Sequence, residues 1–256
     1  KQSTLFHRDA FQGSPHTARI LFIYTVFIVY AELHCLTHYS FLRGASAPEE
    51  LVGRAANSGY HALAITDECS LAGVVKAHVA AKERGLKLIV GSEFTLTEGI
   101  RLVALVPSRE AYGELSGLIS RARRRSGKGE YRVHLRDVIF HLKRCLLILL
   151  PDDTDNQAVH LQQLVRRCKG RVWIGISRLL GNDEWRRFKH RYHIAQTLQV
   201  PMVACGEVQM HSAKRKALHD VLTAIRLQTP VQQLGHRRLI NSQQHLRTLD
   251  TLHSLY

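Results

Sequence analysis

The feature that most constrains the fold is a regular alternation of short apolar runs and longer amphipathic segments from Tyr30 onward. Each apolar run is rich in β-branched residues and has the length of a single strand. We expect strands at Tyr30–Thr37, His61–Glu68, Lys87–Phe94, Arg101–Pro107, Cys145–Pro151, Arg171–Ser177 and Pro201–Val208. The runs are apolar along most of their length, which is typical of a parallel sheet covered on both faces.

Between these runs, apolar residues recur with the helical period, and capping residues or glycines mark the ends. Ser46-x-x-Glu49, with Pro48 in the first turn, predicts a capping box that begins a helix, and Gly59 ends it. Further helices are expected at Leu71–Arg84, Arg109–Arg125, Asp155–Arg167, Asp183–Leu198 and Lys214–Leu227. The last of them has one apolar face, which we expect to point into the core: Leu218, Val221, Leu222 and Ile225.

Repeated strand–helix alternation predicts parallel strands joined by crossover helices. An open doubly wound sheet and a closed (β/α) barrel both fit this pattern. No glycine-rich dinucleotide or phosphate fingerprint follows the first strand, which disfavours the doubly wound sheet. The sequence therefore predicts an α/β protein with a (β/α)7 barrel similar to the TIM barrel.

The charge of the chain indicates a polyanionic partner. Lys and Arg number 36 against 21 Asp and Glu, which gives +15 with neutral histidines. Nucleic acid is the usual partner of such a chain, and an anionic membrane surface is a less frequent one. A hydrophobic fraction of 45% excludes a disordered protein. The five cysteines are scattered without zinc-site spacing, which favours a reducing, cytoplasmic compartment.

The first 29 residues are treated separately from the fold. The apolar run Ile20–Ala31 is shorter than the roughly 20 residues of a membrane-spanning helix, and it is similar to the apolar core of a signal peptide. Its β-branched and aromatic residues also suit a strand. We assign residues 1–29 to a leader outside the fold and keep a secreted or membrane-anchored protein as an alternative.

Polar residues follow several expected strands, at the end where parallel α/β folds carry their chemistry. They are His34, the pair Asp67–Glu68, Glu93, Asp152, Ser177 and Glu207. At one rim, three or four carboxylates and a histidine could bind Mg²⁺, Mn²⁺ or Zn²⁺ and activate a water. Polar residues also follow strands simply because loops begin there, and Asp152 is better explained as a helix N-terminus. Asp67 and Glu93 stay open between a functional site and a structural role.

Several blocks of the sequence carry a recognisable pattern: Tyr30–Ser46, Ala62–Leu71, Leu88–Phe94, Ala111–Leu115, Gly206–His211 and Leu218–Leu227. Together these blocks resemble the N-terminal PHP domain of bacterial C-family DNA polymerases. The similarity is closest to the error-prone, damage-induced members of the family. It implies a distorted barrel of seven βα units whose rim binds up to three metal ions and hydrolyses phosphoester bonds.

The chain departs from the metal-binding motifs that this resemblance implies. Four residues could still bind metal, namely His34, Asp67, Glu93 and, by substitution, Glu207. Other expected ligand positions carry Leu36, Arg43, Glu68, Arg101, Gln209 and a residue near Leu179. We predict that the site is vestigial and has no catalytic residue. Arg43 and Arg101 should pair with Asp67, Glu93 and Glu207 and take over part of the electrostatic role of the metal.

The densest positive segment is 121–144, in which four arginines are nearly contiguous: Arg121, Arg123, Arg124 and Arg125. Cations favour helix C-termini, which explains part of this pattern. Contact with nucleic-acid phosphates explains it equally well in a chain of this charge. The four arginines are therefore candidate nucleic-acid-binding residues.

The expected organisation is the leader 1–29, the barrel domain 30–227 and a connector 228–256 toward a polymerase palm. The resemblance implies that the parent is a DNA-directed DNA polymerase acting in damage-induced mutagenesis and translesion synthesis. It implies Mg²⁺ for the parent, and as partners DNA, deoxynucleotides, accessory mutagenesis proteins and a sliding clamp, with no membrane. The acidic run Pro151–Asp155 is rejected as a palm motif, so this part alone should not polymerise. The main alternative is a stand-alone metal-dependent PHP phosphoesterase or 3′–5′ exonuclease.

Overall fold

The strands form one curved sheet that nearly closes into a barrel. In the computed structural model, residues 29–152 and 157–256 are described, and within them a seven-stranded sheet has the order β1-β2-β3-β4-β5-β6-β7. Its strands are β1 (Ala31–Glu32), β2 (Ala62–Ile65), β3 (Lys87–Thr95), β4 (Arg101–Leu105), β5 (Leu146–Leu149), β6 (Val172–Ile176) and β7 (Met202–Ala204). Beyond β1 and β7, Leu36 N donates to Val208 O at 2.8 Å and Val208 N donates to His34 O at 2.9 Å. These two hydrogen bonds link the first and last strand segments, and the predicted distorted barrel is confirmed.

Strand β4 runs antiparallel to both of its neighbours, so the expectation of seven parallel strands was wrong. β3 and β4 are joined by the tight turn 96–100, in which Leu96 N donates to Ile100 O at 2.8 Å. A parallel pair needs a crossover of about a dozen residues or more, and so short a connection forms a hairpin instead. The reversal places Arg101, the first residue of β4, opposite Thr95 at the end of β3. Arg101 therefore lies at the rim where the parallel strands end.

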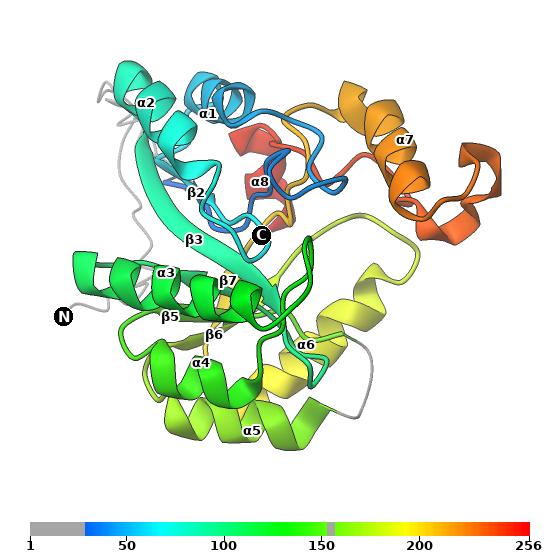
Figure 1. Cartoon of the computed structure of the whole chain (residues 1–256). Helices are drawn as coiled ribbons and strands as arrows, with labels where there is room; N and C mark the ends of the chain where they lie inside the picture. The colour runs from blue at the N-terminus through cyan, green and yellow to red at the C-terminus, as the bar shows by residue number, and fades with distance from the viewer. Residues whose placement is uncertain (1–28, 153–156) are drawn as a thin grey trace, which may run out of the picture.

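Apart from α7, the α-helices of the described residues lie around the sheet in two groups (Figure 1). The α-helices are α1 (Pro48–Asn57), α2 (Val74–Arg84), α3 (Arg109–Arg124), α4 (Leu135–His141), α5 (Ala158–Arg167), α6 (Glu184–Leu198), α7 (Lys216–Arg226) and α8 (Leu249–Leu255). The helices α1, α2 and α8 lie beside β1–β3, and α3 to α6 lie around β4–β7. Each helix expected from the sequence is present, whereas α4 and α8 were not anticipated.

The start of α1 differs from the predicted capping box. Ala47 is the N-cap, and its N–H donates to Glu50 Oε2 at 2.9 Å. Ser46 Oγ instead lies 2.8 Å from His211 Nδ1 and accepts a hydrogen bond from His211 N at 2.9 Å. The serine therefore ties the beginning of α1 to the segment after β7.

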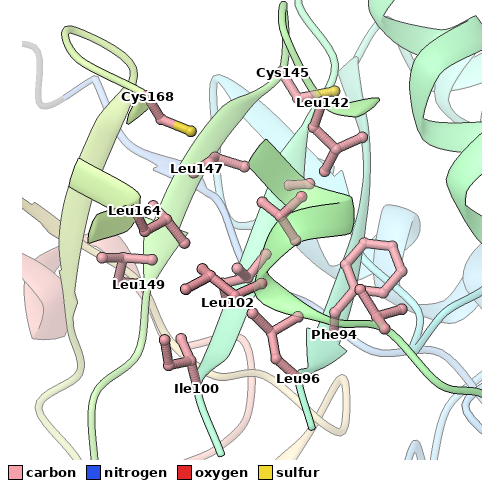
Figure 2. Close-up of a cluster of buried hydrophobic side chains, with 14 of the residues drawn as sticks. Phe94, Leu96, Ile100, Leu102, Leu142, Cys145, Leu147, Leu149, Leu164 and Cys168 are labelled. Carbon is pink, nitrogen blue, oxygen red and sulfur yellow. The ribbon is translucent and has the colours of Figure 1, made fainter. Parts of the chain in front are cut away.

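Both faces of the sheet are buried by side chains that alternate along the strands. Leu102, Leu147 and Leu149 pack into the larger core beneath the helices (Figure 2). Val103 and Ile148, one residue away along β4 and β5, belong to a separate cluster on the opposite face, inside the barrel. Successive strand residues point to opposite faces, so both sets must be apolar where both faces are covered.

The apolar face of α7 does not point into the core, contrary to the prediction. Leu218, Val221 and Ile225 are 39%, 44% and 57% exposed. The buried residues of the helix are instead polar or small: His219, Asp220, Thr223 and Ala224. On the buried face, His219 Nε2 lies 2.6 Å from Gln209 Oε1. This hydrogen bond takes the place of the expected hydrophobic contact.

Part of the expected connector 228–256 folds back onto the barrel. Leu246 and Leu252 are buried in the core formed with α1, α2 and β2. Tyr60 Oη donates to Arg247 O at 2.8 Å. This part of the segment is thus packed into the same body as the strands.

Two predictions concern residues outside the described ones. The expected leader lies there apart from Val29, as does the start of the helix expected at Asp155. None of the helices that are described has the length and apolar character needed to cross a membrane.

The packing predicts unequal costs for the same truncation at two leucines. Leu102→Ala removes a side chain with no exposed surface and should lower the free energy of unfolding by about 2–5 kcal/mol. Leu218→Ala, on the exposed face of α7, should cost less than about 1 kcal/mol. Urea unfolding followed by circular dichroism measures both. A larger cost at Leu218 would contradict the outward orientation of that face.

Candidate functional site

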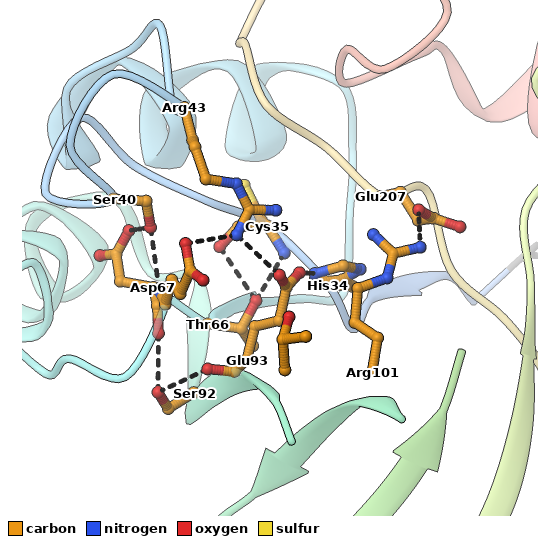
Figure 3. A network of polar contacts seen from close by, with 12 residues as sticks. His34, Cys35, Ser40, Arg43, Thr66, Asp67, Ser92, Glu93, Arg101 and Glu207 are labelled. Atoms are coloured by element: carbon orange, nitrogen blue, oxygen red, sulfur yellow. Dashed lines mark hydrogen bonds and ion pairs between the residues drawn. The ribbon is translucent and has the colours of Figure 1, made fainter. Parts of the chain in front are cut away.

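One rim of the barrel brings together charged residues that are distant in the sequence (Figure 3). His34 follows β1, Asp67 follows β2 and Glu93 lies near the end of β3. Arg101 begins β4 and Glu207 follows β7. The sheet therefore places the sequence-predicted residues at the same rim, where His34 contacts Glu93, Arg101 contacts Glu207, and Asp67 contacts none of the other four.

Glu93 is fully buried and is held by two partners. His34 Nε2 lies 2.6 Å from Glu93 Oε2, and Arg43 Nη1 donates to Glu93 Oε1 at 2.8 Å. Burial alone would raise the pKa of Glu93, but the His34 hydrogen bond and the charges of His34, Arg43 and Arg101 outweigh it and lower this pKa to about 2. Glu93 is therefore a carboxylate whose charge is compensated within the protein.

Arg43 also pairs with Glu68, so that one guanidinium joins two carboxylates. It reaches the rim from a tight turn in which Arg43 N and Gly44 N both donate to Ser40 O. Gly44 is required there, because a Cβ at this position would lie 2.0 Å from Thr37 O. Glu68 is held on its other side by Tyr131 Oη, which donates to Glu68 Oε1 at 2.8 Å.

Glu207 forms the second ion-paired centre. Arg101 Nη2 donates to Glu207 Oε2 at 2.8 Å, and Arg191 Nη2 lies 3.3 Å from Glu207 Oε1. Burial raises the pKa of Glu207, whereas Arg101 and Arg191 together lower it well below the usual range of a glutamate. Ser177 Oγ donates to the same carboxylate at 2.7 Å.

Arg191 was not predicted from the sequence as part of the site. It is 6% exposed and also donates to the carbonyls of Pro151 and Gly175. Its position on α6 could have indicated its burial, because it lies one turn before the buried Ala195 and hence on the same face of the helix. A charged residue on the buried face of a helix indicates a buried partner.

Asp67 differs from the other two carboxylates because it contacts no arginine among the described residues. It accepts hydrogen bonds from Thr37 N and Thr37 Oγ1, both at 2.8 Å, and from Ser40 Oγ at 2.7 Å. Burial raises the pKa of Asp67 despite these hydrogen bonds. The predicted pairing with arginine is thus found for Glu93 and Glu207 and is wrong for Asp67, whose observed role is to fix the turn 37–40.

These donors do not fit a metal cluster of the kind that the family resemblance implies. Within the described part of the chain, no group of three or more His, Cys, Asp or Glu side chains could hold a metal ion together. Oxygens of Glu93 and Glu207 bind guanidinium groups, and both oxygens of Asp67 accept protein hydrogen bonds. We therefore derive no metal-dependent step from this rim.

The four arginines of the basic segment have different environments. Arg123 donates to the carbonyls of Glu68 and Cys69, each at 3.2 Å, and its guanidinium lies 5.3 Å from the centre of the Tyr131 ring. Arg125 forms an ion pair with Asp137. Arg121 contacts His141 on the surface, and Arg124 is exposed. Arg123 is thus part of the structure that holds the loop after β2, while Arg121 and Arg124 remain accessible.

Residues 32–170, more than half of the chain, match the PHP domain family. The chain belongs to this family. Its fold agrees with that of a provisionally named metal-dependent phosphoesterase from Bifidobacterium adolescentis, with a TM-score of 0.51 and 18% identity over 69% of this chain and 86% of that one. An amidohydrolase from Chromobacterium violaceum gives a TM-score of 0.50 and 15% identity, covering 70% of this chain and 87% of that one. At such identities the likeness shows the fold alone.

Curated relatives that match most of the chain are named error-prone DNA polymerase. The protein from Saccharophagus degradans is 53% identical over 228 residues, which is 89% of this chain and 22% of the relative. Those from Teredinibacter turnerae and Pseudomonas aeruginosa are 48% and 47% identical over 90% and 89% of the chain, again covering 22% of each relative. The chain therefore spans about a fifth of the length of these polymerases.

The ion pairs of Glu93 predict how stability depends on pH. With a pKa near 2 in the folded protein and 4.5 as the ordinary value, this group stabilises the fold fully above about pH 4.5. Its contribution is lost as the pH falls from there toward 2. Glu93→Gln should therefore lower the free energy of unfolding at pH 7 by about 3 kcal/mol and flatten its decline in that acid range.

Chemical denaturation at a series of pH values tests this expectation. Glu83→Gln is the matched control, because Glu83 is exposed on α2 and its loss should change stability by less than about 0.5 kcal/mol. If the free energy of unfolding fell as steeply with acid in Glu93→Gln as in the parent protein, the partners of Glu93 would not be what lowers its pKa.

Proposed function

We propose that this chain is the PHP part of an error-prone DNA polymerase and that internal ion pairs replace metal at its rim. The proposal rests on two ion pairs, one between Arg43 and Glu93 and one between Arg101 and Glu207. In this view the domain stabilises the polymerase and contacts DNA or partner proteins, and it does not hydrolyse phosphoesters.

The electrostatics support a vestigial metal site. A divalent ion near Glu93 or Glu207 would have to displace a guanidinium from a buried carboxylate and then remain close to that positive charge. The positions Leu36, Arg101 and Gln209 also supply no imidazole where the family resemblance leads us to expect one. A stand-alone phosphoesterase is not favoured, since the relatives that match about 90% of the chain are named as polymerases.

For the whole protein we propose DNA-directed DNA synthesis with Mg²⁺, in damage-induced mutagenesis and translesion synthesis in the cytoplasm. DNA and deoxynucleotides would be its substrates, with accessory mutagenesis proteins and a sliding clamp as partners. The exposed apolar face of α7, which includes Val221 and Ile225, supports contact with another protein surface.

Metal titration tests the rim directly. Calorimetry with Mn²⁺ and Zn²⁺ should show no stoichiometric binding at micromolar concentration, and the chain should hydrolyse no phosphodiester substrate. A variant that restores expected donors and removes both arginines, Leu36→His, Arg43→Asp, Glu68→His, Arg101→His and Gln209→His, is the positive control and should gain metal affinity. Stoichiometric metal in the parent chain, with hydrolysis abolished by Asp67→Asn, would overturn the proposal.

The accessible arginines predict a salt-dependent contact with DNA. Arg121→Gln combined with Arg124→Gln removes two exposed positive charges near the C-terminal end of α3. The slope of log K against log salt should become shallower by about 1 to 2, because fewer counterions are released on binding. Fluorescence anisotropy with a labelled duplex at several salt concentrations measures this slope.

Arg166→Gln combined with Arg167→Gln is the matched control, since these arginines are exposed near the C-terminal end of α5. Their loss should leave the slope unchanged. Equal slopes for the α3 variant and the parent chain would show that Arg121 and Arg124 do not contact DNA.

A further inference from the structure

A cavity of about 470 Å³ lies against the ion-paired rim, between the barrel and α7. Its inner wall includes Arg43, Glu93 and Arg101, and its opposite wall includes His219 and Thr223 of α7. Phe41, Glu68, Thr95, Gln209, Arg226, Arg237 and Leu239 complete the lining. The cavity therefore lies between the ion-paired rim of the barrel and a helix whose buried face is polar.

The charge of the lining is positive. Four arginines line the cavity against two glutamates, Glu68 and Glu93, and both glutamates are already bound to Arg43. Arg101 is paired with Glu207, so the uncompensated positive charge is that of the other two arginines. His219 adds no charge near neutral pH, because burial lowers its pKa to about 4. Such a lining repels a divalent cation and attracts an anion.

Three buried polar atoms of lining residues have no hydrogen-bond partner within the described residues. They are Arg101 Nε and the hydroxyl Oγ1 of Thr223, which can both donate, and His219 Nδ1. Thr223 itself is only 1% exposed. Buried polar atoms are rarely left unpaired in native proteins, so the two unpaired donors among them indicate a ligand that accepts hydrogen bonds.

The outer part of the cavity supplies two further donors. Arg226 and Arg237 are exposed, and neither forms an ion pair with a described residue. One nitrogen of Arg237 donates to Gln233 O at 3.3 Å, which leaves the rest of its guanidinium accessible. Guanidinium groups bind phosphate oxygens in bidentate geometry, and this makes Arg the residue suited to phosphate recognition.

We propose that this cavity binds a phosphate group without a metal ion, through Arg101 and Thr223 inside and Arg226 and Arg237 at the entrance. The proposal rests on the metal-free rim of the proposed function and adds a ligand to it. The cavity is larger than one phosphate, so the phosphate can be free or can be the end of a nucleic acid strand.

Calorimetric titration of the chain with inorganic phosphate, in EDTA and at constant ionic strength, tests the proposal. The expected result is saturable binding of one phosphate per chain. Arg226→Gln with Arg237→Gln should weaken it at least tenfold, while Arg166→Gln with Arg167→Gln, which removes the same charge from α5, should change it less than twofold.

Thr223→Val separates ligand binding from folding. Replacing an unpaired buried hydroxyl by a methyl group of similar shape should leave the thermal midpoint unchanged or raise it. The same change should weaken phosphate binding about threefold or more, because one donor is lost. Binding that is unaffected by both Thr223→Val and the Arg226–Arg237 double variant would overturn the proposal, as would the absence of saturable binding.

Repeating the titration with added Mn²⁺ distinguishes the two proposals. Phosphate that binds only with metal would overturn both this inference and the metal-free rim, whereas no binding under either condition would overturn this inference alone. A short oligonucleotide with and without a 5′-phosphate identifies the source. Tighter binding of the phosphorylated strand supports a DNA end, and equal binding of both strands alongside saturable inorganic phosphate supports the free anion.

Discussion

The rim depends on the burial of Glu93. A carboxylate with no exposed surface is stable in charged form only when positive or hydrogen-bonding groups compensate its lost hydration. His34 and Arg43 supply that compensation here, and Arg101 and Arg191 do the same for Glu207. In a metal-binding barrel the cation would satisfy such carboxylates. In the proposed function, side chains take the place of this cation, so that no ion is held at the rim to activate a water.

Periodicity was sufficient to predict most of the fold. The helices were located by the 3.6-residue repeat of their apolar faces, and the strands by short continuous apolar runs, because both faces of the sheet are covered. The direction of β4 was missed, since apolar pattern is the same in either direction and only the short turn 96–100 distinguishes them. The predicted orientation of α7 was also wrong, because an apolar stripe does not by itself show which face of a helix is buried. Its apolar stripe is strong, yet Thr223 and His219 on the opposite face pack against the barrel.

The site was predicted in part. Arg43 and Arg101 could be placed near carboxylates because family resemblance located them at ligand positions, and the structure pairs them with Glu93 and Glu207. Asp67 was assigned the wrong partners, because hydroxyl donors from a local turn satisfy it and no sequence pattern distinguishes such donors from a charge. The role of Arg123 was equally hidden, since its bonds are to backbone carbonyls. Contacts made through the backbone leave little trace in residue type.

Arg191 links one outer helix to several strand segments of the barrel. From α6 it reaches the carbonyl after β5, the backbone of β6, and the carboxylate after β7. Three neighbouring strand segments of the barrel are thereby hydrogen-bonded to one helix through one side chain. A shift of α6 along its axis would break these bonds together, and Glu207 would keep Arg101 as its remaining arginine partner. The position of α6 and the charge compensation of Glu207 are therefore coupled through one side chain.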